Sequence, residues 1–480
     1  MKTYKIALKM NVSPDFYPKC IAHIWDKRAI VLLIVDLLDF PGSVWPHILD
    51  TLGPNKKILL VGNKADMLPQ DSSKYLNRVA ESLKKTFLAK CKENSKHFRE
   101  PNIVATCLVS ARTKFNIEHM ISQVYRSWNE KDAYVGCDVY LVGTTNVGKS
   151  SIFNLLLESD LCKVIAMNNV EKAMTSPVPG TTLNLLKFPI MRPDPGRLHK
   201  RILRLKKTAQ VFSRQEKKRL ELLRTYKDQK YAIRRGTVGT TFWKPDKYMP
   251  LTGLGFEMDT QKTPNEKLPN RLNPLHPKFA DGYWCYDTPG TVSEDQIINL
   301  LTQEEVMLMS SEMPWSPKSF LIRNGQTMFI GGLARIDLVQ GPFKLHPLLF
   351  TLYCSDNLPI NMVRTEEADQ FYAEALGTDF LKVPTGSEVR LKDFPALEGK
   401  EFEIDGVTFQ ESSCDLVLSS VGWISCVPKN HEFCTLKAWT PGGRGLFLRQ
   451  YPFLPFGHTL RGTRIMGAPT FANDQIFLPD

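Results

Sequence analysis

The stretch Gly143-Thr144-Thr145-Asn146-Val147-Gly148-Lys149-Ser150 follows the apolar run CDVYLV and precedes a helix-forming segment, SSIFNLLLES, whose second residue is Ser151. The pattern G-x-x-x-x-G-K-[ST] between a strand and a helix is that of a phosphate-binding loop. Its glycines let backbone N–H groups turn toward phosphates, and the helix N-terminus adds a positive dipole. We therefore expect Lys149 to reach the β- and γ-phosphates of a nucleotide and the Ser150 hydroxyl to ligate Mg²⁺. The alternative, an accidental glycine turn, does not explain the strand before the loop and the helix after it.

The chain before this loop alternates short apolar runs with amphipathic stretches. The apolar runs are AIVLLIVDLL, KKILLVGNKAD and NIVATCLVSA, and helical patterns cover residues 72–91 and 117–128. Strands that alternate with helices predict a buried, mostly parallel sheet flanked by helices. The fold class expected for this part is therefore an α/β P-loop domain.

Asn63-Lys64-Ala65-Asp66 stands at the end of the second apolar run, where α/β sheets place ligands. A carboxylate offers two acceptor oxygens to the N1–H and the exocyclic amine of guanine, whereas adenine would leave groups unpaired. Asn63, Lys64 and Asp66 are thus candidates for binding guanine, with Asp66 selecting GTP over ATP. The tetrapeptide alone is a weak signal.

Ser110-Ala111 stands at the end of the third apolar run, after the predicted strand NIVATCLV. It fits a loop whose backbone amide meets the guanine O6. By itself the dipeptide would be read as a plain strand-to-helix turn, and only the other motifs favour a role in binding the base.

Two further tetrapeptides resemble the switches of GTPases. Asp287-Thr288-Pro289-Gly290 resembles the D-x-x-G switch, in which Asp287 would hold Mg²⁺ through water and the Gly290 amide would sense the γ-phosphate. Pro179-Gly180-Thr181-Thr182 resembles the switch whose threonine closes on Mg²⁺, and we favour Thr182 over Thr181 for that role. Simple Pro-Gly turns are the alternative for both.

The order of these motifs is unusual. Ras-like GTPases run from the phosphate loop through the two switches to the base-recognition motifs, whereas here the positions are 63, 110, 143, 182 and 287. This order is similar to that of circularly permuted GTPases, whose contacts survive because the old termini lie close together. The D-x-x-G switch then leads directly into the C-terminal part and could reorient it.

The positive charge is concentrated in one segment. The net charge of +12 comes from 62 Lys and Arg against 50 Asp and Glu, and residues 192–235 hold 16 of the basic and 4 of the acidic side chains. One or two basic helices are predicted there, with RNA or another polyanion as the partner. A solvated helical insertion or a flexible basic loop is the alternative.

Composition narrows the class of protein. Hydrophobic residues make up 42% and charged residues 23%, as in folded globular proteins. The longest strongly apolar run, Ala29 to Val35, is far shorter than the roughly 20 residues of a membrane span, so none is expected. Ten cysteines without a C-x-x-C pair predict reduced thiols and no structural zinc cluster. The N-terminus carries no readable transit peptide.

Beyond about residue 300 the pattern changes to short alternating runs with turn signals. CDLVLSSVGWISCV and GLFLRQYPF read as strands, and residues 402–409 read as a two-residue hairpin around Asp405-Gly406. We expect a GTPase domain over residues 1–300, with a basic insertion at about 190–280. A mostly β, α+β domain is expected over residues 301–480.

The five motifs, together with FIGGLARIDLV at residues 329–339 and VLSSVGWISCV, resemble the YqeH family of permuted GTPases and its mitochondrial members. The resemblance implies GTP and GDP as ligands and a role in small ribosomal subunit assembly and mitochondrial translation. It also implies small-subunit ribosomal RNA and ribosomal proteins as partners, in the mitochondrial matrix. The domain over residues 301–480 would then interact with RNA or the ribosome. The family normally begins with a cysteine-rich zinc module that this sequence does not contain, so zinc is not carried over.

Two residues bear on hydrolysis. Thr291 stands where Ras-like enzymes keep the glutamine that orients the attacking water, which predicts slow turnover. Asn146 resembles the asparagine with which potassium-activated GTPases help hold K⁺, although it could simply stabilise the loop. Lys149, Thr182 and Asn146 are the expected catalytic residues, with Mg²⁺ and K⁺ as cofactors.

Three functions compete on this basis. The first is a slow GTPase that switches ribosome assembly, and the second is a nucleotide-gated RNA-binding scaffold in which hydrolysis is incidental. A metabolic kinase is disfavoured because Asp66 and Ser110-Ala111 specify a guanine pocket. Nitric oxide synthase chemistry is disfavoured because we recognise no flavin or NADPH fingerprint.

Overall fold

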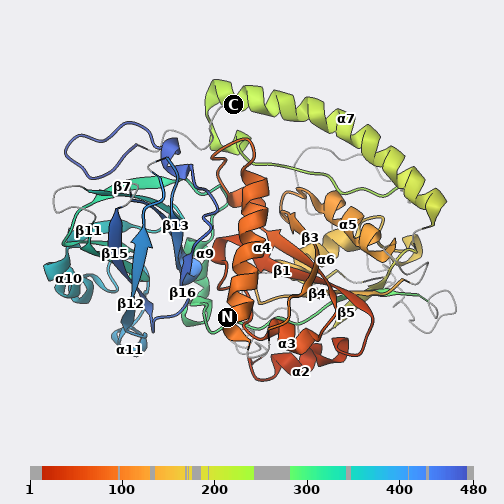
Figure 1. Cartoon of the computed structure of the whole chain (residues 1–480), viewed down its shortest axis with the longest axis horizontal. Helices are drawn as coiled ribbons and strands as arrows, with labels where there is room; N and C mark the ends of the chain where they lie inside the picture. Colours follow the sequence, from red (N-terminus) through yellow and green to blue (C-terminus); the bar gives the residue numbers. More distant parts are fainter. Residues whose placement is uncertain are drawn as a thin grey trace, which may run out of the picture.

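A six-stranded sheet forms the centre of the first part of the molecule (Figure 1). The computed structural model describes residues 13–95, 98–129, 136–167, 170, 172–175, 185–192, 194–242, 282–341, 347–408, 410–428 and 432–472. Thr181 and Thr182 lie outside these residues. The strand order is β3-β2-β1-β4-β6-β5. The strands are β1 (Ala29–Asp36), β2 (Lys57–Asn63), β3 (Asn102–Leu108), β4 (Asp138–Val142), β5 (Leu186–Pro189) and β6 (Trp284–Asp287).

Parallel pairing brings the ends of the motif-bearing strands together. β1 pairs in parallel with β2 and β4, β2 with β3, and β4 with β6, while β5 runs antiparallel to β6. Asp36 at the end of β1 is in register with Asn63, and Leu141 is in register with Asp287. The predicted mostly parallel sheet is confirmed. Its carboxyl edge collects segments that are far apart in the chain.

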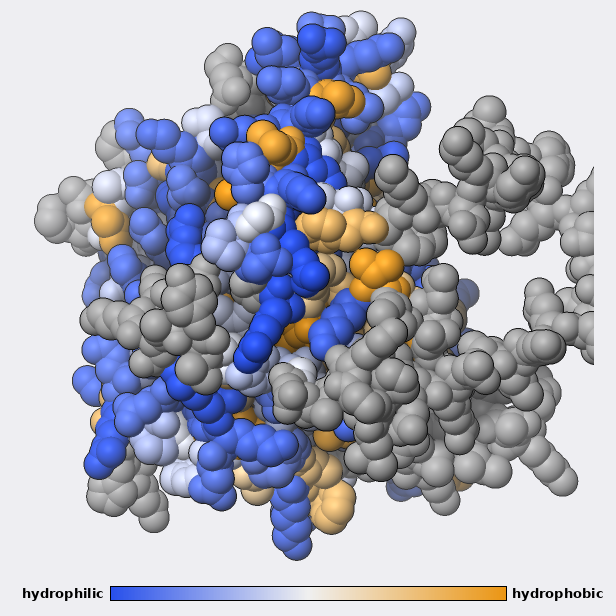
Figure 2. Space-filling model, turned by 90° about the vertical axis from the view of Figure 1, so that its right-hand side faces the viewer, coloured by the Kyte–Doolittle hydropathy of each residue, from blue (hydrophilic) through white to orange (hydrophobic). Residues whose placement is uncertain are grey.

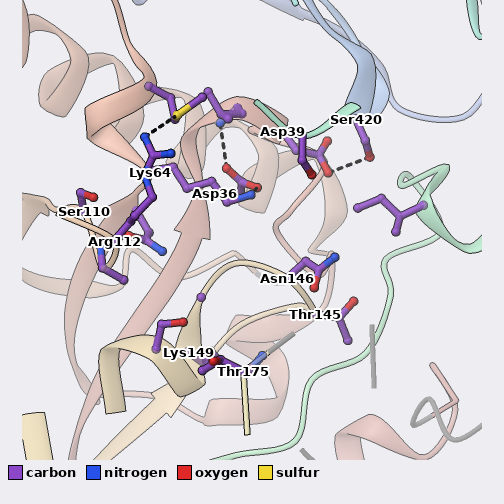
Figure 3. Close-up of a pocket in the computed structure, with 18 of the residues that line it drawn as sticks. Asp36, Asp39, Lys64, Ser110, Arg112, Thr145, Asn146, Lys149, Thr175 and Ser420 are labelled. Carbon is purple, nitrogen blue, oxygen red and sulfur yellow. Dashed lines mark hydrogen bonds and ion pairs between the residues drawn. The ribbon is translucent and has the colours of Figure 1, made fainter. Parts of the chain in front are cut away.

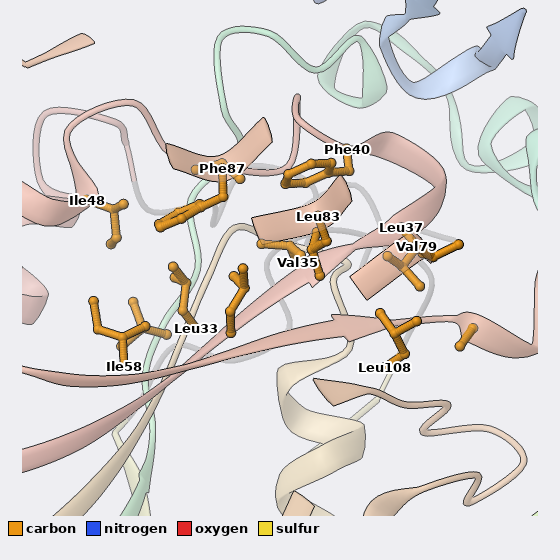
Figure 4. Packing of buried hydrophobic residues seen from close by; sticks show 14 of the residues in the cluster. Leu33, Val35, Leu37, Phe40, Ile48, Ile58, Val79, Leu83, Phe87 and Leu108 are labelled. Atoms are coloured by element: carbon orange, nitrogen blue, oxygen red, sulfur yellow. The ribbon is translucent and has the colours of Figure 1, made fainter. Parts of the chain in front are cut away.

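Helices cover both faces of this sheet. β1 is buried throughout, and its alternate side chains enter two apolar clusters. Leu33 and Val35 pack with Leu83 and Phe87 on one face (Figure 4). The helices are α2 (Tyr17–Ile21), α3 (Ile48–Leu52), α4 (Tyr75–Asn94), α5 (Ile117–Asn129) and α6 (Lys149–Leu157). The two helices predicted at 72–91 and 117–128 correspond to α4 and α5.

The basic segment forms one long helix, α7 (Pro195–Tyr226), of 32 residues. Asp194 caps its N-terminus by accepting a hydrogen bond from the backbone N–H of Arg197, and Pro195 occupies the first turn. Figure 1 shows α7 along the upper edge of the molecule, above α5. No helix in the described part of the chain has the length and apolar character needed to cross a bilayer.

The C-terminal part is mostly β, as predicted. One five-stranded antiparallel sheet has the order β16-β13-β14-β10-β7, and the other has the order β11-β8-β9-β15-β12. The strands are β7 (Lys318–Ile322), β8 (Gln326–Ile330), β9 (Ala334–Gln340), β10 (Leu348–Cys354), β11 (Ile360–Arg364), β12 (Leu397–Asp405), β13 (Cys414–Leu418), β14 (Gly422–Val427), β15 (Phe433–Pro441) and β16 (Leu446–Arg449). The helices are α9 (Gln303–Met309), α10 (Ala368–Ala375) and α11 (Glu388–Asp393). All ten cysteines of the chain are free thiols.

The hairpin predicted around Asp405-Gly406 is wrong. β12 pairs antiparallel with β15, so that Asp405 is opposite Phe433 and the Gly406 N–H donates to the Glu432 carbonyl. Val407 is exposed, and Phe409 lies outside the described residues. Pairing with β15 buries Phe402 and Ile404 in the core between the sheets. This long-range burial overrides the local turn signal.

Candidate guanine-nucleotide site

The phosphate-loop sequence connects β4 to α6, as the sequence predicts, and its two glycines are required by geometry. Gly143 has a φ of 155°, and a Cβ there would lie 2.3 Å from the carbonyl oxygen of Ile34. Gly148 has a φ of 92°, and a Cβ there would lie 2.2 Å from Nδ2 of Asn63. The loop therefore fits tightly against the ends of β1 and β2.

Lys149 lies inside this loop and is buried. Its Nζ donates hydrogen bonds to the carbonyl oxygens of Gly143 at 2.9 Å and Thr144 at 2.6 Å. Burial lowers the pKa of Lys149 to about 8, and the charge of Asp287 opposes that shift. A Cβ on Gly290 would lie 2.4 Å from Nζ of Lys149, so the D-x-x-G glycine adjoins this lysine.

Ser150 and Asp287 form a pair of hard oxygen donors beside the lysine. The Ser150 hydroxyl donates to Oδ2 of Asp287 at 2.8 Å. Oδ1 of Asp287 is buried, and no hydrogen-bond partner for it exists among the described residues. Burial raises the pKa of Asp287 to about 6, while Lys149 and Ser150 act in the opposite direction. A buried carboxylate oxygen and a hydroxyl suit Mg²⁺, which prefers oxygen ligands.

Asn63 links the base-recognition segments to the phosphate loop. Its Nδ2 donates to the carbonyl oxygen of Val147 at 2.7 Å, and its Oδ1 accepts from the backbone N–H of Ala111 at 3.0 Å. Ser110 is fully buried, and its hydroxyl accepts from the N–H of Thr113 at 3.0 Å. Residues 63, 110–111 and 147 thus meet in space although they are far apart in sequence.

Asp66 is paired with a residue that the sequence analysis missed. Arg112 donates to Oδ2 of Asp66 from Nε at 2.9 Å and from Nη2 at 2.6 Å, and to the carbonyl oxygen of Glu312 from Nη1 at 2.6 Å. Lys64, with a left-handed φ of 67°, forms an ion pair with Asp36. The signal that could have revealed Arg112 is its position directly after Ser110-Ala111.

These residues surround a cavity of about 570 Å³ (Figure 3), which is within the size range of small-ligand sites. Most of the predicted site residues line it: Asn63, Lys64, Asp66, Ser110, Ala111, Thr145, Asn146, Gly148, Lys149, Ser150, Ser151 and Gly290. Gly143, Thr144, Val147 and Asp287 adjoin it through the contacts above. The C-terminal part and the segment before it add lining residues that the sequence analysis missed, among them Met309, Trp315 and Ser420.

Thr145 contacts the residue that follows the D-x-x-G segment, and Asn146 lies next to it in the loop. The N–H of Thr145 donates to the carbonyl oxygen of Thr291 at 2.8 Å, and Oγ1 of Thr145 is buried with no partner among the described residues. Asn146 has a φ of 62° and lines the cavity. Figure 3 shows the two side chains below Asp39 and Ser420.

Asp39 is a second residue that the sequence analysis missed. It lies just beyond β1, and its Oδ2 accepts hydrogen bonds from Nε2 of Gln296 at 2.6 Å and from the Ser420 hydroxyl at 2.9 Å. Burial raises the pKa of Asp39 to about 7. The carboxylate thus connects the end of β1, the segment after the D-x-x-G motif and the C-terminal part. An acidic residue shortly after a buried strand was its only sequence signal.

Comparison with known proteins identifies the family. A family model described as a 50S ribosome-binding GTPase matches residues 138–231, and one described as YqeH-like, C-terminal, matches residues 348–451. Nitric oxide-associated protein 1 of Homo sapiens is 34% identical over 96% of this chain and 69% of the human protein. The Mus musculus protein of that name is also 34% identical, with the same coverage. The chain belongs to the YqeH and nitric oxide-associated protein 1 family.

The YqeH branch of this family is more distant. The uncharacterized protein YqeH of Bacillus subtilis is 24% identical over 94% of this chain and 88% of the bacterial protein. Membership in the family makes this chain a GTP-binding protein with a GTPase domain, and a Mg²⁺ requirement follows from that domain.

Proposed function

We propose that this chain is a slow, K⁺-stimulated GTPase that acts as a switch in assembly of the mitochondrial small ribosomal subunit. The observation that carries the proposal is the double hydrogen bonding of Asn63, to Val147 in the phosphate loop and to Ala111 in the base-recognition loop. One nucleotide spanning the cavity can therefore meet both its base and its phosphate ligands. The strand order around β4 and the order of the motifs support a circularly permuted G domain.

Each group has a proposed role in binding the nucleotide. Asp66 accepts the guanine N1–H and amine, the Ala111 amide meets the guanine O6, and Lys149 binds the β- and γ-phosphates. Ser150, Asp287 and Thr182 would hold Mg²⁺, which neutralises phosphate charge when bound. The Gly290 amide senses the γ-phosphate.

Slow turnover follows from the residue after Gly290. Thr291 is fully buried, and its backbone carbonyl accepts the hydrogen bond from Thr145. Its short side chain cannot replace the glutamine that orients water in Ras-like enzymes. Asn146, at the cavity wall, would hold K⁺, a cation that supplies positive charge near the phosphates.

Two variants test the nucleotide site. Lys149→Ala should abolish GTP binding measured by calorimetry, with the thermal unfolding midpoint of the free protein retained. Asp66→Asn should weaken binding of GTP and favour binding of xanthosine triphosphate. The asparagine amide donates a hydrogen bond at the position where guanine also donates one. Wild-type protein that binds ATP as tightly as GTP would contradict the guanine assignment.

Monovalent cations test the role of Asn146. Phosphate release from GTP should rise severalfold when K⁺ replaces Na⁺, and Asn146→Ala should remove that difference while retaining GTP affinity. Equal rates in the two salts would remove K⁺ from the proposal and leave the GTPase itself intact.

The ribosomal role needs a test in cells. The family model over residues 138–231 names the 50S ribosome, whereas resemblance to YqeH implies the small subunit. A relative from Arabidopsis thaliana, 24% identical over 88% of this chain and 58% of that protein, is named chloroplastic/mitochondrial. Depletion of the protein should cause precursors of the mitochondrial small subunit to accumulate in sucrose gradients, and the Lys149→Ala variant should not rescue them. Accumulation of large-subunit precursors would reverse the assignment.

A nucleotide-gated RNA scaffold is the second candidate, and the exposed basic helix α7 favours it. Thr182→Ala, chosen to stop turnover but spare GTP binding, separates the two. Rescue of ribosome assembly by this variant supports the scaffold, and failure to rescue supports the GTPase switch.

A further inference from the structure

The basic side chains of α7 fall into two groups with different surroundings. On the inner side, Arg201 is buried and donates to Ser122 and to Glu118 of α5, with Nη2 2.6 Å from Oε2 of Glu118. Arg204 donates to Oε1 of Glu118 at 2.8 Å and to Oδ2 of Asp160 at 2.9 Å. These arginines attach the helix to the GTPase fold, and their charges are matched by acids.

The segment after α7 returns along the helix and fixes its position. The Thr241 N–H and hydroxyl bond to the carboxylate of Asp160, and the Gly239 N–H donates to Glu118. Near the other end, Nε2 of Gln229 donates to the Ser316 hydroxyl at 2.7 Å. The helix is therefore held at both ends against the body of the protein.

The outer side of α7 carries basic residues of a different kind. They are all exposed, and no ion pair joins any of them to an acid in the described part of the chain: Lys200, Lys206, Lys207, Arg214, Lys217, Lys218 and Arg224. Lys207, Arg214 and Lys218 are spaced by seven and four residues, which places them on one side of the helix at about 3.6 residues per turn. Lys200 and Arg224 are about 36 Å apart along the axis at about 1.5 Å per residue.

We infer that this outer face of α7 is a docking surface for the phosphate backbone of folded, base-paired RNA. We call the seven residues the α7 basic face. A row of positive side chains on a fixed helix can neutralise several phosphates at once without reading bases. This inference deepens the proposed function, since it assigns the surface by which the switch would hold its RNA.

A membrane surface fits this face less well. Interfacial helices bury a continuous apolar stripe. The exposed aliphatic residues Ile202, Leu203 and Val211 project in three different directions at about 100° per residue, so they form no continuous stripe along α7. In Figure 2, hydrophilic side chains predominate over the upper part of the visible face, and hydrophobic ones occur as separate spots.

Base pairing in the RNA is favoured because no exposed Phe, Tyr or Trp lies between Lys200 and Arg224 along α7. Proteins that bind unpaired strands stack bases on aromatic side chains. Tyr226, the exposed aromatic residue of α7, follows the basic face at the end of the helix. Recognition by charge and shape, as in proteins that bind double-stranded RNA, fits this surface.

The test uses the full chain and a labelled RNA stem-loop, with affinity measured between about 50 and 200 mM KCl. The variant Lys207→Gln/Arg214→Gln/Lys218→Gln should weaken binding by about tenfold or more and reduce the slope of log affinity against log salt by about 2 to 3. The matched control, Lys19→Gln/Lys84→Gln/Lys92→Gln, removes the same charge from exposed positions on α2 and α4. The RNA affinity of this control and the salt dependence of its binding should stay close to those of the wild type.

Three results would overturn the inference: an unchanged stem-loop affinity in the α7 variant, an equal loss in the control, or tighter binding of an unpaired RNA homopolymer. Loss of binding to phosphatidylserine-rich vesicles with unchanged RNA affinity would assign the face to a membrane. GTP affinity and the unfolding midpoint of the α7 variant should match wild type, which excludes misfolding. Wild-type protein that binds RNA through this face but binds no GTP would overturn the proposed function and leave this surface standing.

Discussion

Two residues outside the predicted motifs shape the nucleotide site. Arg112 lies on the carboxylate that would recognise guanine, and Asp39 lies where the GTPase part meets the C-terminal part. Both follow sheet strands by a few residues. Their partners, Asp66, Gln296 and Ser420, are set by the fold, so these contacts could not be read from local sequence.

In the proposed function, guanine would compete with Arg112 for the carboxylate of Asp66. The Arg112 side chain is 44% exposed, so its ion pair is screened and is worth only about 1 kcal/mol. Arg112→Ala should therefore tighten GTP binding by about threefold to fivefold in calorimetry. Arg112→Lys, which cannot donate both hydrogen bonds to Asp66, is the matched control. Its GTP affinity should fall between those of the wild type and Arg112→Ala. Weaker GTP binding by Arg112→Ala would instead mean that Arg112 contacts the nucleotide.

Asp39 should make stability depend on pH. Burial raises its pKa to about 7, with Asp36 adding repulsion, while Gln296, Ser420 and Lys64 act in the opposite direction. Between about pH 4 and pH 7 the folded protein keeps a proton that the unfolded chain has released, so this carboxyl destabilises the fold as pH rises. At pH values above 7, this carboxyl lowers the free energy of unfolding by at most about 4 kcal/mol.

Asp39→Asn removes this titration and keeps an oxygen acceptor. The wild type should lose stability between pH 5 and pH 8 as Asp39 ionises, whereas the variant should not. The difference in thermal unfolding midpoint, variant minus wild type, should therefore increase over this range. Asp379→Asn, at an exposed position, is the control and should give a constant difference. A constant difference for Asp39→Asn as well would show that Asp39 is ionised throughout this range.

At the scale of elements, the phosphate loop and the D-x-x-G segment act as one unit. Gly290 approaches Lys149 and the backbone of Thr144 so closely that a methyl group has no space. The strands and helices themselves were predictable because apolar residues recur with strand or helix periods, as in β1 and α5. The hairpin at 405–406 was not, because β12 takes its partner from a distant segment.

Gly290→Ala should displace Lys149 or the loop. A Cβ would lie 2.4 Å from Nζ of Lys149 and 3.1 Å from the Thr144 carbonyl. We expect GTP affinity to fall at least tenfold, with a small change in the unfolding midpoint. Gly196→Ala, in the exposed first turn of α7, is the control, because its Cβ would meet only Asp194, at 3.2 Å. Equal GTP affinities for the two variants would contradict the tight fit between switch and lysine.

At the scale of the whole molecule, the two parts share one apolar core. Trp423, Phe453 and Leu454 of the C-terminal part pack in the same cluster as Leu33 and Val35 of the central sheet. Beside that core, Arg449 donates to Oδ2 of Asp415 at 2.6 Å and to the Phe40 carbonyl at 3.1 Å. Both charged side chains are fully buried.

Breaking this ion pair should destabilise the whole chain. Asp415→Asn leaves the Arg449 charge buried without its counter-ion, at a cost of about 3 to 5 kcal/mol, and should lower the thermal unfolding midpoint. The matched control is Asp369→Asn, whose carboxylate pairs with Arg335 but is 90% exposed, and it should cost at most about 1 kcal/mol. Similar midpoints for the two variants would show that the Arg449–Asp415 pair does not stabilise the junction.

The sequence by itself determined the central sheet, the phosphate loop, the guanine motifs and the basic character of residues 192–235, because these depend on periodicity and on local spacing. Only the tertiary structure decided that Arg112 and Asp39 reach the cavity, and that α7 divides into an inner face paired with acids and an outer face in solvent. The physical reason is that ion pairs and burial depend on which distant segments fold side by side. Arg201 and Arg204 lie on the inner face because they pair with Glu118 and Asp160, and these pairs cannot be predicted from the order of residues along α7.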